Sequence, residues 1–115
     1  MLEDFKLKVF LKVSELGSFT TAARSLGISQ PAVSQTISEL EKFAGDKLFD
    51  RSCKGNLQLT EKGRVFKSFA EKISKNYEDL NAVFNDYEAF VSFIKMSEEI
   101  KSNPLYEGLK DIFFN

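Results

Sequence analysis

The strongest constraint in this 115-residue chain is a run of apolar residues whose spacing alternates between four and three positions. This alternation is the heptad pattern of a helix that buries one long face, and no Pro or Gly interrupts it between residues 64 and 103. The positions are Phe66, Ala70, Ile73, Tyr77, Leu80, Phe84, Tyr87, Val91 and Ile94. A helix over residues 61–96 would be about 54 Å long, more than one small domain can cover. We therefore predict a long linker helix over residues 63–97.

Two interpretations differ in what covers this face. The first two turns, with Phe66, Ala70 and Ile73, could pack on the helix's own domain. The later positions are predicted to pair with a second copy as a coiled coil. The predicted dimerisation residues are Ile73, Tyr77, Leu80, Phe84, Tyr87, Val91 and Ile94. Residues 98–115 place Leu105, Leu109 and Ile112 at helical spacing, which predicts a short carboxy-terminal helical segment.

The first 62 residues carry the signals of three helices and a hairpin. Helices are predicted over 4–16, 20–26 and 30–44, because Ser18 and Ser29 can cap the second and third, and glycines follow all three. Short strands are predicted over 47–51 and 57–60, and Thr60 opens the long helix. The expected fold is mainly α: a winged helix-turn-helix over residues 1–62, followed by the dimerisation helix.

The turn between the second and third helices has the spacing of a helix-turn-helix. Ala23 lets the two helices touch, Gly27 adopts the turn conformation, and Val33 is buried between them. Opposite the apolar face of the third helix lie side chains that carry no charge: Gln30, Pro31, Ser34, Gln35 and Ser38. Gln can bond adenine with two hydrogen bonds and Ser can donate or accept, so this face is typical of direct base reading. The alternative is a polar face that merely lacks charge.

Basic residues are placed where DNA phosphates would lie. Residues 1–67 hold 11 Lys/Arg and 8 Asp/Glu, whereas residues 68–115 hold 5 Lys and 9 Asp/Glu, so the first part is +3 and the second −4. Chance is the alternative explanation of this asymmetry. Arg51 and Lys54 lie on the predicted hairpin. Thr20, Thr21 and Ser29 lie at helix amino termini, where backbone N–H groups favour phosphate.

Composition excludes most enzyme and metal chemistry. The chain has no His and one Cys, so triads that use His, zinc sites and internal disulfides are not expected. We expect no catalytic residue, no metal and no cofactor. No segment has the length and hydropathy of a membrane span, and a reducing, cytoplasmic location is expected. Cys53 beside Lys54 is interpreted as an inert exposed thiol, with a redox switch as the alternative.

The stretches SQPAVSQTISELE, LFDR and LTEKG resemble the LysR-type transcriptional regulators, and the similarity covers about residues 2–95. The resemblance implies binding of double-stranded DNA as a homodimer, or a higher oligomer, with recognition helices in successive major grooves and linker helices paired antiparallel. By position it implies that Gln30, Pro31, Ser34 and Gln35 meet bases or nearby backbone, and that Arg51 anchors the wing. Gln35 stands where many relatives carry Arg.

The resemblance also shapes the functional hypothesis. The effector-binding domain of the family would need some 200 further residues, and residues 98–115 do not resemble its start. The first hypothesis is a dimeric regulator that lacks this domain and binds operators without a small-molecule inducer. The alternatives are a fragment of a full-length, ligand-responsive regulator, and an interaction protein that forms heterodimers with longer relatives.

Overall fold

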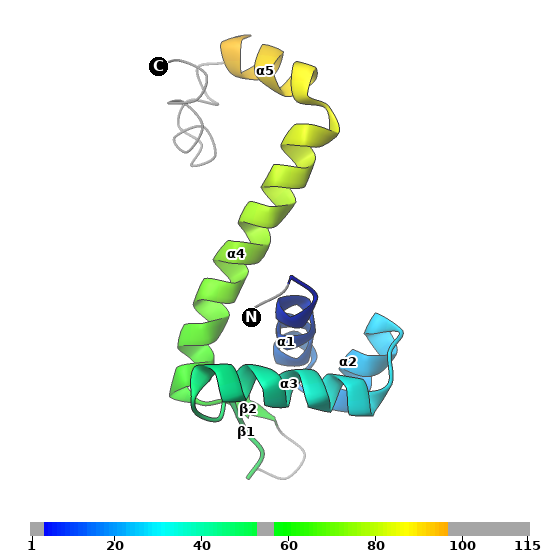
Figure 1. Cartoon of the computed structure of the whole chain (residues 1–115), viewed down its shortest axis with the longest axis vertical. Coiled ribbons are helices and arrows are strands. Elements are labelled where there is room, and N and C mark those ends of the chain that lie inside the picture. Colours follow the sequence, from blue (N-terminus) through cyan, green and yellow to red (C-terminus); the bar gives the residue numbers. More distant parts are fainter. Residues whose placement is uncertain (1–3, 53–56, 97–115) are drawn as a thin grey trace. The chain divides into compact units, whose positions relative to one another are not determined.

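The computed structural model describes residues 4–52 and 57–96 (Figure 1). Contacts divide the chain into two compact units, residues 1–74 and 75–115. The elements are α1 (Asp4–Leu16), α2 (Phe19–Leu26), α3 (Gln30–Ala44), β1 (Phe49–Asp50), β2 (Gln58–Leu59), α4 (Glu61–Asn85) and α5 (Tyr87–Met96). None of the helices in these described ranges is long and apolar enough to cross a lipid bilayer.

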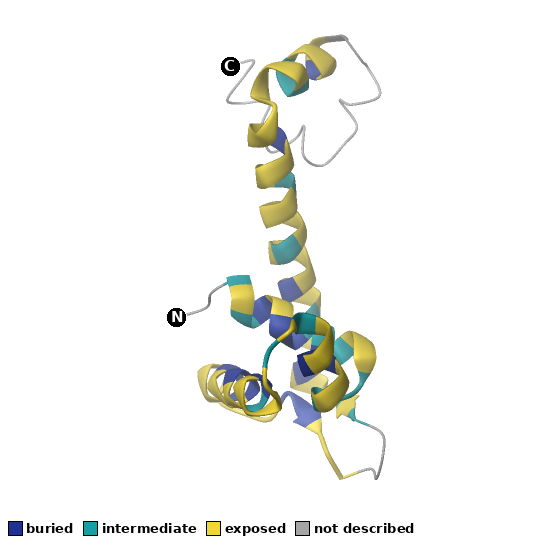
Figure 2. Ribbon diagram, turned by 90° about the vertical axis from the view of Figure 1, so that its right-hand side faces the viewer, coloured by how far each residue is buried: buried dark blue, intermediate teal, exposed yellow. Residues whose placement is uncertain are grey.

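The core of the first unit lies where α1, α2 and α3 meet, and each of these helices contacts the other two. Ala22 and Ala23 of α2 are buried, and their small side chains let the neighbouring helices approach. Figure 2 colours the buried residues of the helices dark blue. The ring of Phe10 lies 5.2 Å from that of Phe49 and 4.7 Å from that of Phe66, measured between centroids. The aromatic contacts therefore join α1 to β1 and to the start of α4.

The helix boundaries follow from the predicted caps and turns. The Ser18 hydroxyl accepts a hydrogen bond from the backbone N–H of Thr21 at 3.1 Å, and Ser29 accepts one from Ala32 at 3.2 Å. Gly27 ends α2 in the left-handed conformation with φ of 69°. The three predicted helices are confirmed, and so is the helix-turn-helix order.

The two strands form an antiparallel pair in which Phe49 faces Leu59 and Asp50 faces Gln58. Each strand has two residues, fewer than predicted, and the backbone N–H of Leu48, just before β1, donates to the Glu41 carboxylate and not to the opposite strand. The Lys47 carbonyl accepts from the Thr60 hydroxyl at 2.7 Å, and the Leu48 carbonyl accepts from the Thr60 N–H at 3.0 Å. The hairpin tip, with Cys53 and Lys54, lies outside the described residues.

The prediction of one unbroken linker helix over residues 63–97 is wrong. Helix α4 ends at Asn85, and α5 begins at Tyr87. The carboxylate of Asp86, between them, accepts from the N–H of Ala89 at 3.2 Å and so caps α5. A side chain that caps a new helix competes with continuation of the old one. The predicted segment over residues 98–115 lies outside the described residues.

Candidate nucleic-acid interface

The exposed side of α3 carries the predicted base-reading residues. Gln30, Pro31, Gln35 and Ser38 are exposed and Ser34 is half-buried, whereas Val33, Ile37 and Leu40 on the other side are fully buried. The structure thus brings the five uncharged positions together on one helix and separates them from the core. No charged side chain lies among them until Glu39.

The amino terminus of α2 presents Thr20 and Thr21 to solvent. Helix α2 begins at Phe19, and its first-turn N–H groups carry a partial positive charge. The N–H of Thr21 is already bonded to Ser18, so the remaining N–H groups of that turn are the ones available to an anion. The exposed hydroxyls and the helix terminus together favour a phosphate over a base edge.

Arg51 directly follows β1, and its guanidinium lies over an aromatic ring. Its guanidinium carbon lies 4.5 Å from the centroid of the Phe19 ring, and that ring meets Phe49 edge-on at 6.1 Å. A cation over a ring face is attracted by the ring quadrupole, which restricts where the guanidinium can lie. Sequence reasoning found Arg51 but missed Phe19, because no local spacing links the two residues.

Two lysines near the hairpin are paired with carboxylates within the first unit. Lys47 Nζ lies 3.8 Å from the carboxylate of Glu41, and Lys62 Nζ lies 3.4 Å from that of Asp46. The backbone N–H of Lys47 and the ammonium of Lys62 hold the pKa of the Asp46 carboxyl below its usual value. These lysines therefore lie beside carboxylates that offset part of their charge.

Glu41 is a structural residue that the sequence did not reveal. It is only 7% exposed, and its Oε2 accepts from the backbone N–H groups of Leu48 at 2.8 Å and Phe49 at 3.4 Å. One carboxylate on α3 thus satisfies two buried donors at the start of the hairpin. This bond ties the wing to the helix that carries the polar face.

The side chains of Lys6, Gln35 and Glu39 form a chain of polar contacts. Gln35 Nε2 donates to Glu39 Oε1 at 3.3 Å, and Lys6 Nζ on α1 lies 2.9 Å from Glu39 Oε2. The Lys6 ammonium and the Gln35 amide hold the pKa of the Glu39 carboxyl below its usual value. Neither Lys6 nor Glu39 was among the predicted site residues, although Gln35 and Glu39 are four residues apart on α3.

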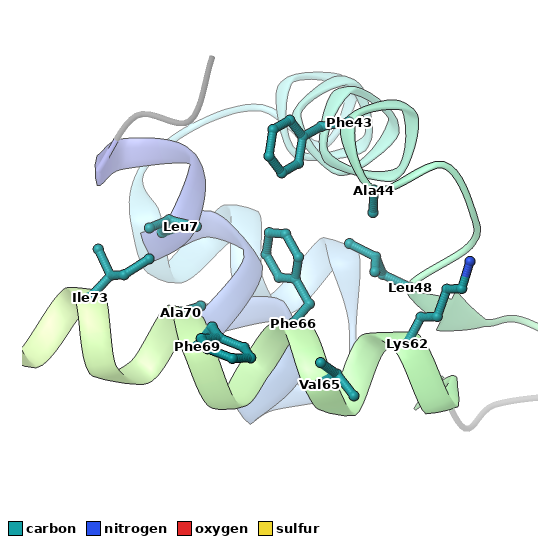
Figure 3. A pocket seen from close by; sticks show the side chains of 10 residues that line it. All are labelled: Leu7, Phe43, Ala44, Leu48, Lys62, Val65, Phe66, Phe69, Ala70 and Ile73. Atoms are coloured by element: carbon teal, nitrogen blue, oxygen red, sulfur yellow. The ribbon is translucent and has the colours of Figure 1, made fainter.

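A second surface of the first unit is apolar. A groove of about 350 Å³ is lined by residues of α1, the end of α3, and the first half of α4, as Figure 3 shows. Phe66 and Ala70 pack on the domain core, as the first interpretation of the linker helix proposed. That interpretation was wrong for Ile73, which does not belong to the core. Phe43, Val65, Phe69 and Ile73 instead remain 45–60% exposed.

Four of the predicted dimerisation residues in the second unit are exposed. These are Tyr77, Leu80, Phe84 and Tyr87, at 40–61% exposure, and the rings of Phe84 and Tyr87 stack with centroids 5.2 Å apart. Val91 is half-buried. Ile94 is only 1% exposed within the single chain, so it does not extend the exposed apolar face formed by the four residues above. The break at Asp86 separates Val91 and Ile94 from the exposed apolar face of α4.

Comparison with known proteins identifies the family. Residues 5–64 match the model of the bacterial regulatory helix-turn-helix proteins of the lysR family. The HTH-type transcriptional regulator TfdT of Cupriavidus pinatubonensis is 42% identical over 72 residues, which cover 63% of this chain and 31% of TfdT. The chain therefore spans less than a third of the length of that curated relative.

Solved structures agree with the sequence match. The BenM DBD in complex with catB site 1 DNA aligns with a TM-score of 0.69 and 32% identity, covering 73% of this chain and 92% of that one. The CbnR DBD in complex with DNA aligns with a TM-score of 0.67 and 30% identity, covering 73% and 95%. The chain belongs to the lysR family of bacterial regulatory helix-turn-helix proteins and contains the DNA-binding domain of a transcriptional regulator of that family.

Proposed function

We propose that this chain binds operator DNA as a homodimer and reads bases in the major groove with the exposed side of α3. The observation that carries the proposal is the face formed by Gln30, Ser34, Gln35 and Ser38, which is uncharged and lies opposite a fully buried apolar side. The major groove presents a distinct pattern of donors, acceptors and methyl groups for each base pair. An amide side chain can bond adenine through two hydrogen bonds, and a hydroxyl can donate to or accept from a base edge.

Contacts to the phosphate backbone are proposed to come from groups outside the exposed side of α3. Arg51 on the Phe19 ring, the α2 amino terminus with Thr20 and Thr21, and the Ser29 cap of α3 are the proposed phosphate-binding groups. Lys54 joins them as a prediction from the sequence alone. Such contacts fix the position of the protein on the duplex and give affinity, and they do not distinguish sequences.

The dimer is proposed to form through α4. Apolar side chains are exposed along both parts of this helix: Phe69 and Ile73 in the first unit, and Tyr77, Leu80 and Phe84 in the second. Residues 61–74 hold four Lys/Arg and two Asp/Glu, a net +2, and residues 75–85 hold one Lys and two Asp/Glu, a net −1. An antiparallel pair places the positive half of one helix beside the negative half of its partner, whereas a parallel pair places like charges together.

The test of base reading is selection from a pool of random DNA duplexes, followed by binding measurements on the selected site. Gln35→Ala is expected to lose roughly 1–3 kcal/mol of preference at one base pair and to leave binding to random duplex unchanged. Gln58→Ala on β2 removes the same exposed side chain from the wing and serves as the control. Equal weakening of selected and random duplexes by Gln35→Ala would contradict a base-reading role.

A further inference from the structure

Gln35 does not project alone from α3. Its amide nitrogen donates to Glu39 at 3.3 Å, and the other oxygen of Glu39 lies 2.9 Å from the ammonium of Lys6. Lys6 comes from α1, so two helices of the first unit fix the position of one carboxylate. The carboxylate in turn contacts the side chain to which we assign base reading.

The chemistry of Glu39 dictates how the Gln35 amide must be turned. An ionised carboxylate has only acceptors, so the amide must direct its NH₂ group, not its oxygen, toward Glu39. One N–H of Gln35 is thereby occupied. The amide oxygen and the second N–H remain for a base, and they present one acceptor and one donor. The lowered pKa of the Glu39 carboxyl keeps this residue ionised at neutral pH.

We propose that Glu39 is a positioning residue that turns Gln35 toward adenine and against guanine. This inference rests on the proposed base-reading role of Gln35. Adenine presents a donor at N6 and an acceptor at N7, which match the free oxygen and the free N–H of the turned amide. Guanine presents two acceptors, O6 and N7, and so requires two donors. With one N–H held by Glu39, the amide cannot supply both.

Lys6 also offsets the negative charge of Glu39 near DNA. The Glu39 side chain is 42% exposed and the Lys6 side chain 24% exposed, so the pair lies at the surface. A carboxylate so near DNA would be repelled by the phosphates, and an adjacent ammonium offsets that repulsion. Lys6 thus holds Glu39 in place when the duplex approaches, and loss of Lys6 should loosen the control of Gln35.

The main test is Glu39→Gln, which keeps the shape of the side chain but offers both a donor and an acceptor. The measured quantity is the ratio of affinities for two selected duplexes that differ only in A·T or G·C at the pair read by Gln35. The intact chain should prefer A·T by about tenfold, and Glu39→Gln should reduce that ratio to about threefold or less. Glu61→Gln removes an equal charge elsewhere and should leave the ratio unchanged. An undiminished ratio in Glu39→Gln, or a preference of the intact chain for G·C, would overturn the proposal.

Two further variants distinguish failure of the positioning role of Glu39 from failure of the base-reading role of Gln35. Lys6→Met should lower the same ratio by a smaller factor than Glu39→Gln does. In a Gln35→Ala background, Glu39→Gln should have no effect on the ratio, because the two side chains act as one unit. If Gln35→Ala alone leaves every base preference intact, the base-reading function is wrong and this inference falls with it. If Gln35→Ala removes the preference but Glu39→Gln does not, only the positioning role is wrong.

Discussion

The guanidinium carbon of Arg51 lies 4.5 Å from the centroid of the Phe19 ring, which joins the end of β1 to the first residue of α2. The charge of Arg51 therefore lies against the ring of the residue that precedes Thr20 and Thr21, at a helix terminus that itself favours anions. An Arg guanidinium can both stack on a ring and bond a phosphate, since its donors lie in the plane of the group.

Arg51→Ala should weaken binding to all duplexes alike. It should also lower the slope of log affinity against log salt by about one unit, because one phosphate contact is lost. Arg51→Lys retains the charge without the planar stack, so it should keep the slope while lowering affinity. Fluorescence anisotropy over a salt series measures both quantities. A change of base preference in either variant would contradict a role confined to phosphates.

Glu41→Ala should destabilise the fold. Removal of the carboxylate leaves the buried N–H groups of Leu48 and Phe49 without this acceptor, which should lower the free energy of unfolding by about 2–3 kcal/mol. Glu41→Gln keeps one acceptor oxygen, so its loss should be smaller. Urea denaturation followed by circular dichroism gives these values. Glu15→Ala, an exposed change on α1, should shift stability by no more than about 0.5 kcal/mol.

Gly63→Ala should be destabilising although it lies in a helix. In an open helix, Ala is favoured over Gly by about 1 kcal/mol. At Gly63, however, a Cβ would overlap the backbone carbonyl of Leu48, so α4 or the residues before β1 would have to move. The expected cost is about 1–3 kcal/mol of unfolding free energy. Ser68→Ala, at an exposed position of α4, is the control, and a stability increase in both variants would show that α4 tolerates the methyl group.

Lys6→Met should raise the pKa of the Glu39 carboxyl toward its ordinary value. The ion pair lowers that pKa in the folded state, so its contribution to stability is complete above the unfolded-state pKa and is lost as pH falls through the folded-state value. Carbon NMR of the Glu39 carboxyl over a pH series follows the change directly. Lys8→Met, whose ammonium pairs with Asp4 instead, should leave the Glu39 titration where it was.

Local signals were sufficient to predict the helices of the first unit. Ser18, Ser29 and Thr60 cap helices through bonds to residues three positions ahead, and Gly27 ends one through its own backbone. Each of these effects depends on neighbours in sequence, so the residue types alone reveal it. The break at Asp86 had a local signal as well, since Asp is a strong cap, but the apolar spacing continues across it and favoured a single helix.

The same distinction, between effects of neighbours in sequence and contacts between elements, applies to the site residues. The polar side of α3 was predictable because its period is that of the helix. The ring beneath Arg51, the ammonium beside Glu39, and the two N–H groups that donate to Glu41 were not, because each contact joins one element to another and follows no helical or strand spacing. The burial of Ile94 was missed for a related reason: heptad spacing identifies an apolar face but does not say what covers it.

Leu80→Asp together with Phe84→Asp should convert the proposed homodimer into a monomer. Both side chains are more than half exposed on α4, and burying two carboxylates in an apolar interface costs on the order of several kcal/mol. Light scattering should give twice the 13.1 kDa chain mass for the intact protein and the single mass for the variant. Ala82→Asp with Asn85→Asp adds the same charge to exposed positions away from that face, and should remain dimeric.

The outcome of this experiment also locates the interface along α4. Antiparallel pairing brings Leu80 and Phe84 of one copy toward the first half of α4 in the other, where Phe69 and Ile73 line the apolar groove. Phe69→Asp should therefore dissociate the dimer as well, because it places a carboxylate on the opposing surface. A parallel pair would instead set Phe69 against its own counterpart, and a charge-reversed copy carrying Phe69→Lys would then restore association when mixed with Phe69→Asp. In the antiparallel arrangement that mixture should stay monomeric, since each changed residue meets an apolar side chain and not its opposite charge.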